Sequence, residues 1–204
     1  MFLINDSLTV VLVGDWNKLF IQPDWMASNI FEKEEIEIGV NGQGSDFSIS
    51  YKGDGVIISP GQTNMVFSVI NTDDEILDNL CKCLNNFIEK AFTPQLLAYG
   101  LNVDFVEDND IIFAEVLDSM SDTTPIVENG YEIISTKVSR TLKQDERIIN
   151  MDSSLENRNL RVHFNEHHAS EENAPNFSRA GIREFLDECG RILLGLGYEI
   201  EGDE

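Results

Sequence analysis

Between residues 35 and 69, a series of short segments carries an apolar residue at every second position, and this spacing constrains the fold more than any other feature. Alternation with a period of two places the apolar side chains on one face of a β-strand. Gly and Pro residues that favour turns separate the segments, which predicts an antiparallel meander. The four predicted strands are residues 35–40, 46–51, 56–59 and 65–69.

A long amphipathic helix is predicted at residues 73–92, directly after the meander. Its apolar side chains recur every three or four positions and form one stripe, as in a helix that packs on a sheet. Thr72 and Glu75 have the spacing of a capping box, in which a hydroxyl and a carboxylate bind free backbone N–H groups at the start of a helix. A tight turn is predicted at Gly53-Asp54-Gly55, because Asp and Gly tolerate positive φ.

The order of predicted elements in residues 8–92 recurs in residues 96–196. Each part reads strand, helix, three or four strands and a long helix, and a repeated order at this scale suggests an internal duplication. The further predicted elements are a strand at 8–13, a short helix that begins at Pro23, a strand at 95–106, a helix at 108–120, strands at 131–141, 147–151 and 159–164, and a helix that Ser178 caps and that ends near residue 196.

This order of elements resembles the topology of TATA-binding-protein-like folds. The resemblance implies two α/β units that build one curved antiparallel sheet with both long helices on one face, and it implies no functional residue. The alternative topology is a helix-grip sheet wrapped around the last helix, with residues 73–92 as an insertion. We therefore expect a single α+β domain over residues 1–204, with pseudo-repeats at about 8–92 and 96–196 and an acidic tail at 199–204.

The charge of the chain argues against several classes of partner. Fourteen Lys and Arg residues stand against 37 Asp and Glu residues, which gives a formal net charge of −23. Nucleic-acid binding depends on basic residues that neutralise phosphates, and anionic membranes attract the same residues. We therefore expect a protein partner and neither nucleic acid nor a membrane.

The three cysteines, Cys81, Cys83 and Cys189, are an odd number, and Cys81 and Cys83 point in different directions on the predicted helix. A disulfide framework is not expected, so a reducing compartment, the cytoplasm, is the predicted location. No apolar segment approaches the length of a membrane span, about 20 residues.

All three histidines of the chain lie within six residues of one another, together with one glutamate. Imidazole and carboxylate groups are usual zinc ligands, so His163, Glu166, His167 and His168 are the residues to consider for a metal. The His-Glu-x-x-His pattern is absent, and a strand would point neighbouring side chains to opposite faces. We therefore predict no metal and no other cofactor.

No motif of a catalytic nucleophile or a phosphate-binding loop occurs, so we predict no catalytic residue. Trp16 and Trp25 are candidates for partner contacts, because Trp is frequent among the residues that dominate binding energy; packing in the core is their alternative role.

The predicted strands of the second part carry three arginines, Arg140, Arg147 and Arg161, and some of them could line the face of the sheet that has no helices. Local ion pairs are the alternative for these arginines.

These observations leave three hypotheses for function. The leading one is a non-enzymatic cytosolic protein-interaction domain that self-associates, for instance as a homodimer. The alternative is an acidic inhibitor or nucleic-acid mimic that binds a basic partner, since no basic residue occurs between Lys90 and Lys137. The third is a metal-dependent enzyme that uses the cluster from His163 to His168.

Overall fold

A computed structural model of the chain describes residues 1–14, 16, 21–43, 46–91, 96–107, 128–129, 135–145, 147–156, 159–169 and 175–200. The predicted helix at 108–120 lies outside the described residues, as do positions 201–204 of the predicted acidic tail. The statements below concern the described part of the chain.

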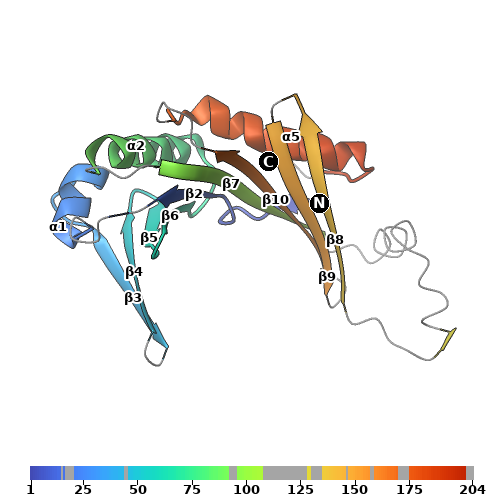
Figure 1. The fold of residues 1–204 in the computed structure, drawn as a ribbon, viewed down its shortest axis with the longest axis horizontal. Coiled ribbons are helices and arrows are strands. Elements are labelled where there is room, and N and C mark those ends of the chain that lie inside the picture. Colours follow the sequence, from blue (N-terminus) through green and yellow to red (C-terminus); the bar gives the residue numbers. More distant parts are fainter. Residues whose placement is uncertain are drawn as a thin grey trace.

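One large antiparallel sheet organises an α+β fold, and Figure 1 shows that it is curved. Its strands lie in the order β3-β4-β5-β6-β2-β7-β10-β9-β8, and β1 pairs with β7 beside this path. In chain order the strands are β1 (Phe2–Leu3), β2 (Thr9–Gly14), β3 (Glu37–Gln43), β4 (Asp46–Gly53), β5 (Val56–Pro60), β6 (Asn64–Val69), β7 (Leu96–Glu107), β8 (Ser135–Gln144), β9 (Arg147–Glu156) and β10 (Asn159–Ala169).

The predicted meander is confirmed as strands β3 to β6. Asp54 and Gly55 adopt φ angles of 49° and 77° in the turn between β4 and β5, as the Asp-Gly sequence predicts. Strand β10 runs beyond the predicted end at residue 164, because β7 pairs with it as far as Ala169, opposite Ala98. The polar residues at this end therefore lie on a strand and not in a loop.

Helices α2 (Asp74–Lys90) and α5 (Arg179–Gly195) correspond to the two predicted long helices, and both lie on the same side of the sheet (Figure 1). As predicted, Ser178 caps α5, with its Oγ accepting a hydrogen bond from the backbone N–H of Gly181 at 3.2 Å. The predicted short helix begins at Pro23 as α1 (Pro23–Trp25) and continues as the π-helix η2 (Met26–Phe31). None of the described helices is long and apolar enough to cross a membrane.

The capping box predicted from Thr72 and Glu75 is wrong. Asp73 is the N-cap residue of α2, and no side chain caps this helix. Thr72 is buried, and its carbonyl oxygen accepts a hydrogen bond from Nη2 of Arg183 in α5 at 2.7 Å. Thr72 therefore contacts α5 through its backbone carbonyl and does not cap α2.

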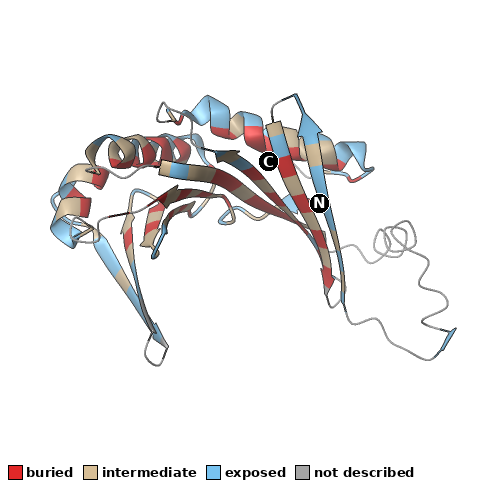
Figure 2. Cartoon of the chain, in the orientation of Figure 1, coloured by how far each residue is buried: buried red, intermediate tan, exposed pale blue. Residues whose placement is uncertain are grey.

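The core lies between the sheet and these helices. Figure 2 shows buried residues alternating with half-buried and exposed ones along the strands, as one-sided burial requires. Phe87 of α2 packs edge-on against Trp16 and Phe67, with ring centroids 4.9 and 5.7 Å away.

The three cysteines are free and buried, and burial raises the pKa of Cys81 to about 11 and that of Cys83 to about 12. Both of these thiols are therefore protonated at neutral pH.

Adjacent leucines in α5 provide a matched test of this core. Leu193 is fully buried, whereas Leu194 is 57% exposed. Leu193→Ala is expected to lower the free energy of unfolding by about 3 kcal/mol, because it removes buried methyl groups and leaves a cavity. Leu194→Ala, with the same change in helix propensity, should stay within about 0.5 kcal/mol of the parent in urea denaturation. Equal losses for the two variants would contradict this packing.

Candidate functional site

Strand β10 carries the four residues considered for a metal, and its alternation divides them between two faces. Glu166 is buried on the face that carries the helices, and His168 points to the same side. His163 and His167 occupy the alternate positions, toward the open face. Within the described residues, no group of three or more His, Cys, Asp or Glu side chains is arranged to hold a metal ion.

Glu166 is the centre of a buried polar cluster, and only 4% of its surface is exposed. Arg147, at the start of β9, donates from Nε to Oε1 at 2.7 Å and from Nη2 to Oε2 at 2.6 Å. Nε2 of His168 lies 3.0 Å from Oε1. A buried carboxylate is costly unless it is paired, and this one is paired through both of its oxygens.

These contacts set the protonation state of Glu166. Burial acts to raise the pKa of Glu166, but the hydrogen bonds from His168 and Arg147, together with their charges, lower it below its ordinary value. The carboxylate is therefore ionised at neutral pH and acts as a hydrogen-bond acceptor, not as a proton donor.

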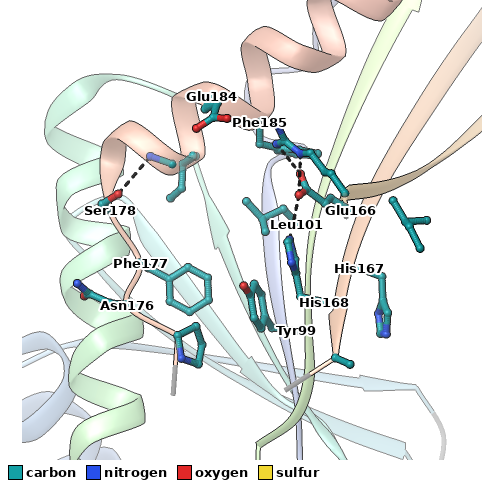
Figure 3. A pocket seen from close by; sticks show the side chains of 16 residues that line it. Tyr99, Leu101, Glu166, His167, His168, Asn176, Phe177, Ser178, Glu184 and Phe185 are labelled. Atoms are coloured by element: carbon teal, nitrogen blue, oxygen red, sulfur yellow. Dashed lines mark hydrogen bonds and ion pairs between the residues drawn. The ribbon is translucent and has the colours of Figure 1, made fainter. Parts of the chain in front are cut away.

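A pocket of about 790 Å³ adjoins this cluster, between the beginning of α5 and the ends of β7 and β10 (Figure 3). Tyr99 and His168 stack in it with centroids 4.5 Å apart and planes 10° from parallel, and Phe177 meets Tyr99 edge-on at 5.3 Å. Asn85 of α2 holds Phe177 by two hydrogen bonds: Phe177 N–H donates to Oδ1 at 2.9 Å, and Nδ2 donates to the Phe177 carbonyl at 2.8 Å. The aromatic wall is thus anchored to the other long helix.

The open face of β7 and β10 holds a second buried carboxylate, Asp104, which is 6% exposed. Nη2 of Arg161 donates to its Oδ2 at 2.6 Å, and Nδ1 of His163 lies 3.0 Å from Oδ1. Burial acts to raise the pKa of Asp104, but the hydrogen bonds from His163 and Arg161 lower it overall. This carboxylate is also ionised at neutral pH.

A ladder of amides and a hydroxyl continues across the open face from β7 to β8. Nδ2 of Asn165 donates to Oδ1 of Asn102 at 2.8 Å. Nδ2 of Asn150 donates to Oδ1 of Asn165 at 3.4 Å, and the Thr141 hydroxyl donates to Oδ1 of Asn150 at 2.9 Å. The open face of the second part is therefore polar and largely satisfied by its own cross-strand contacts.

The structure assigns different positions to the candidate interaction residues. Of the three arginines, Arg161 points to the open face, whereas Arg147 and Arg140 lie on the face that carries the helices. Arg147 and Arg161 form the local ion pairs described above, while Arg140 is exposed and forms none with a described residue. Trp16 is 7% exposed and packs in the core; Trp25 is half-buried, and its contact with a partner stays a prediction.

Sequence analysis did not single out Tyr99 or Phe177, because each reads as an ordinary core position. The available signal was Glu166 itself. It follows Phe164 at a spacing of two and therefore points to the same side of the strand. An acidic residue at an inward position requires a buried partner, but the sequence does not say which base provides it.

A scan against protein-family models finds no match for this chain, and a search of curated proteins finds none either. The functional proposal below therefore rests on the geometry of the strands, edges and pocket.

Glu166→Gln is expected to lower the free energy of unfolding at pH 7 by about 3 kcal/mol, because it leaves Arg147 without its anion. It should also flatten the acid dependence of stability. The pKa of Glu166 is lowered by folding, so its ionisation stabilises the protein above the unfolded pKa, about 4.3, and this stabilisation is lost as the pH falls through the folded pKa. Urea midpoints between pH 7 and pH 3 measure both effects.

Glu184→Gln is the matched control, since its carboxylate is 71% exposed at the rim of the same pocket. Its stability profile should follow that of the parent protein. A Glu166→Gln variant with the parent profile would show that the buried pairing does not stabilise the fold.

Proposed function

We propose that this protein is a non-enzymatic interaction domain that self-associates through the two edge strands of its sheet, β3 and β8. The opposite charges of these edges are the observation that carries the proposal. Within the described residues, no strand pairs with the outer side of either one. Unpaired edges present a row of backbone donors and acceptors to another strand.

The basic edge is β8. Lys137, Arg140 and Lys143 are exposed on it, and no acidic residue occurs between Ser135 and Gln144. Lys137 pairs with Asp152 at 2.8 Å, but Arg140 and Lys143 form no ion pair with a described residue. In a chain with a net charge of −23, a ten-residue strand whose charged side chains are all positive is a local exception.

The acidic edge is β3 together with the residues before it. Glu34, Glu35 and Glu37 are exposed there, and no basic residue occurs from position 34 to position 43. Glu37 reaches Lys52 at 3.2 Å, whereas Glu34 and Glu35 form no ion pair with a described residue. Edges of opposite sign attract one another and repel copies of themselves, so charge selects pairing of β3 with β8.

Apolar side chains accompany both edges on the face that carries the helices. Ile38 and Val40 of β3 are 45% and 63% exposed, and Ile49 of β4 is 43% exposed. On β8, Val138 and Leu142 are half-buried on that same face. Extension of the sheet by a second copy would place these residues beside one another and remove apolar surface from water.

The direction of the strands defines the geometry of this contact. Nine strands lie along the path and alternate in direction, so β3 and β8 run parallel within one molecule. A second copy that keeps its helices on the same side of the extended sheet therefore places its β3 parallel to β8. This contact is heterologous, because different surfaces of the two copies meet.

We also propose that the sheet contains two related units, as in the TATA-binding-protein-like topology. Strands β2 and β7 lie side by side near the middle of the sheet, and each is flanked on its outer side by the last strand of its own unit, β6 or β10. Each unit then continues outward through its hairpins and ends in one long helix. This arrangement leaves one edge per unit free for association.

The non-enzymatic part of the proposal rests on the state of the reactive groups. A general base needs a pKa near the working pH and access to its substrate. Glu166 and Asp104 are ionised and held by arginine and histidine, and burial raises the pKa of the described thiols. These groups suit structure and recognition more than proton transfer.

A charge exchange between the edges tests self-association. Arg140→Glu/Lys143→Glu gives β8 the sign of β3, and Glu35→Lys/Glu37→Lys gives β3 the sign of β8. Each variant alone is expected to associate at least about tenfold more weakly than the parent, because like charges then face one another. An equimolar mixture should recover association, since each variant supplies the complementary edge; sedimentation velocity at 0.15 M salt measures both.

Glu75→Lys/Glu89→Lys is the matched control for the acidic edge, since it makes the same change in net charge on exposed positions of α2. It should not weaken association. A parent protein that stays monomeric at high concentration, or a mixture that fails to recover association, would contradict the proposal.

Salt should affect this association in two directions. At about 0.01 M salt the screening length is about 30 Å, and the repulsion between two copies of charge −23 dominates. At about 0.15 M it is about 8 Å, which suppresses that repulsion but leaves the attraction between adjacent edges, and near 1 M both are screened. Association is therefore expected to be strongest at intermediate salt. The alternative hypothesis, an acidic inhibitor or mimic, predicts a different result. Its binding to a basic protein would weaken steadily as the salt concentration rises.

A further inference from the structure

The pocket beside Glu166 has features of a ligand site that the proposed self-association does not use. We infer that it binds a small monoanion, a carboxylate attached to a planar apolar body, with Arg147 as the residue that recognises the carboxylate. This inference stands independently of the proposed function, because it concerns the pocket and not the sheet edges.

Arg147 uses only part of its guanidinium within the protein. Its Nε and Nη2 donate to Glu166, which holds the planar group in one orientation. Its Nη1 lies 3.6 Å from Oε1 of Glu184, which is longer than a hydrogen bond. No other described acceptor binds Nη1, so donors of a fixed guanidinium remain available in the pocket, which Arg147 lines. Arginine in this state is suited to a planar carboxylate.

The remaining polar groups also favour an acceptor as the ligand. Glu166 already accepts hydrogen bonds from Arg147 and His168 through both oxygens, so it has little capacity for a ligand donor. Nε2 of His168 is engaged with Glu166, which leaves Nδ1 of the same ring on its other side. Glu184 opposes an anion, but its carboxylate is 71% exposed at the rim and is screened by water.

The walls of the pocket specify the body of the ligand. Tyr99, Phe177 and Phe185 line it with aromatic surface (Figure 3). Its volume of about 790 Å³ exceeds that of an inorganic ion and suits a small organic molecule. The net charge of −23 repels polyanions, which leaves a ligand with a single negative charge as the best match.

Titration calorimetry with the full chain tests this inference. The probes are 2-naphthoate, the neutral 2-naphthalenemethanol, the cationic 2-naphthylmethylamine and inorganic phosphate. We expect 2-naphthoate to bind at least about tenfold more tightly than the other three, because only it combines the anion with the planar body. Glu184→Gln should tighten 2-naphthoate binding by about two- to fivefold, since it removes the competing carboxylate.

Arg147→Gln/Glu166→Gln removes both charges of the buried pair together and should weaken 2-naphthoate binding at least about tenfold. Circular dichroism checks the fold of this variant; if it does not fold, the probe series and Glu184→Gln decide the question alone. Tighter binding of the amine, or weaker 2-naphthoate binding in Glu184→Gln, would overturn the inference, as would no binding of 2-naphthoate. Equal binding of phosphate and 2-naphthoate would show that no planar body is recognised. Loss of self-association with intact 2-naphthoate binding would refute only the proposed function.

Discussion

Strand β7 is the element on which the rest of the structure depends, because it hydrogen-bonds to β2 along one edge and to β10 along the other. Strand β2 belongs to the first part of the chain, and β10 belongs to the last. Their pairing with β7 joins the two parts into one sheet, so that α2 and α5 cover a single continuous core. The same pairing brings β10 and its polar residues beside the inner strands.

The two buried carboxylates of β7 and β10 are compensated in the same way on opposite faces. Asp104 is held by one arginine and one histidine on the open face, and Glu166 is held by one arginine and one histidine beside α5. Arginine is always charged, so each acid stays ionised despite burial. Such groups stabilise one arrangement of strands, because a shift of register by one residue would move each acid to the other face.

The basic residues of the second part differ in whether they form ion pairs, and this difference gives the two sheet edges different charges. Arg147 and Arg161 pair with these buried acids, and Arg179 and Arg183 reach acidic residues of α2. Arg140 and Lys143, in contrast, stay unpaired among the described residues on β8. The charge pattern of the fold is therefore acidic over most of its length and basic along one edge, which gives the molecule two different ends.

Local pattern by itself determined which segments become strands and helices, since the periods of two and of three to four reflect the backbone geometry of each element. It predicted the meander, the turn at Asp54 and Gly55, and the cap at Ser178. It failed at Thr72, because α2 begins one residue later than the capping box requires, with Asp73 as its N-cap residue, and at the end of β10, where pairing with β7 prolongs the strand. Only the tertiary structure decided that Arg147, His168 and the pocket meet the Glu166 carboxylate, because those contacts depend on strand register and on the packing of α5, which no local period encodes.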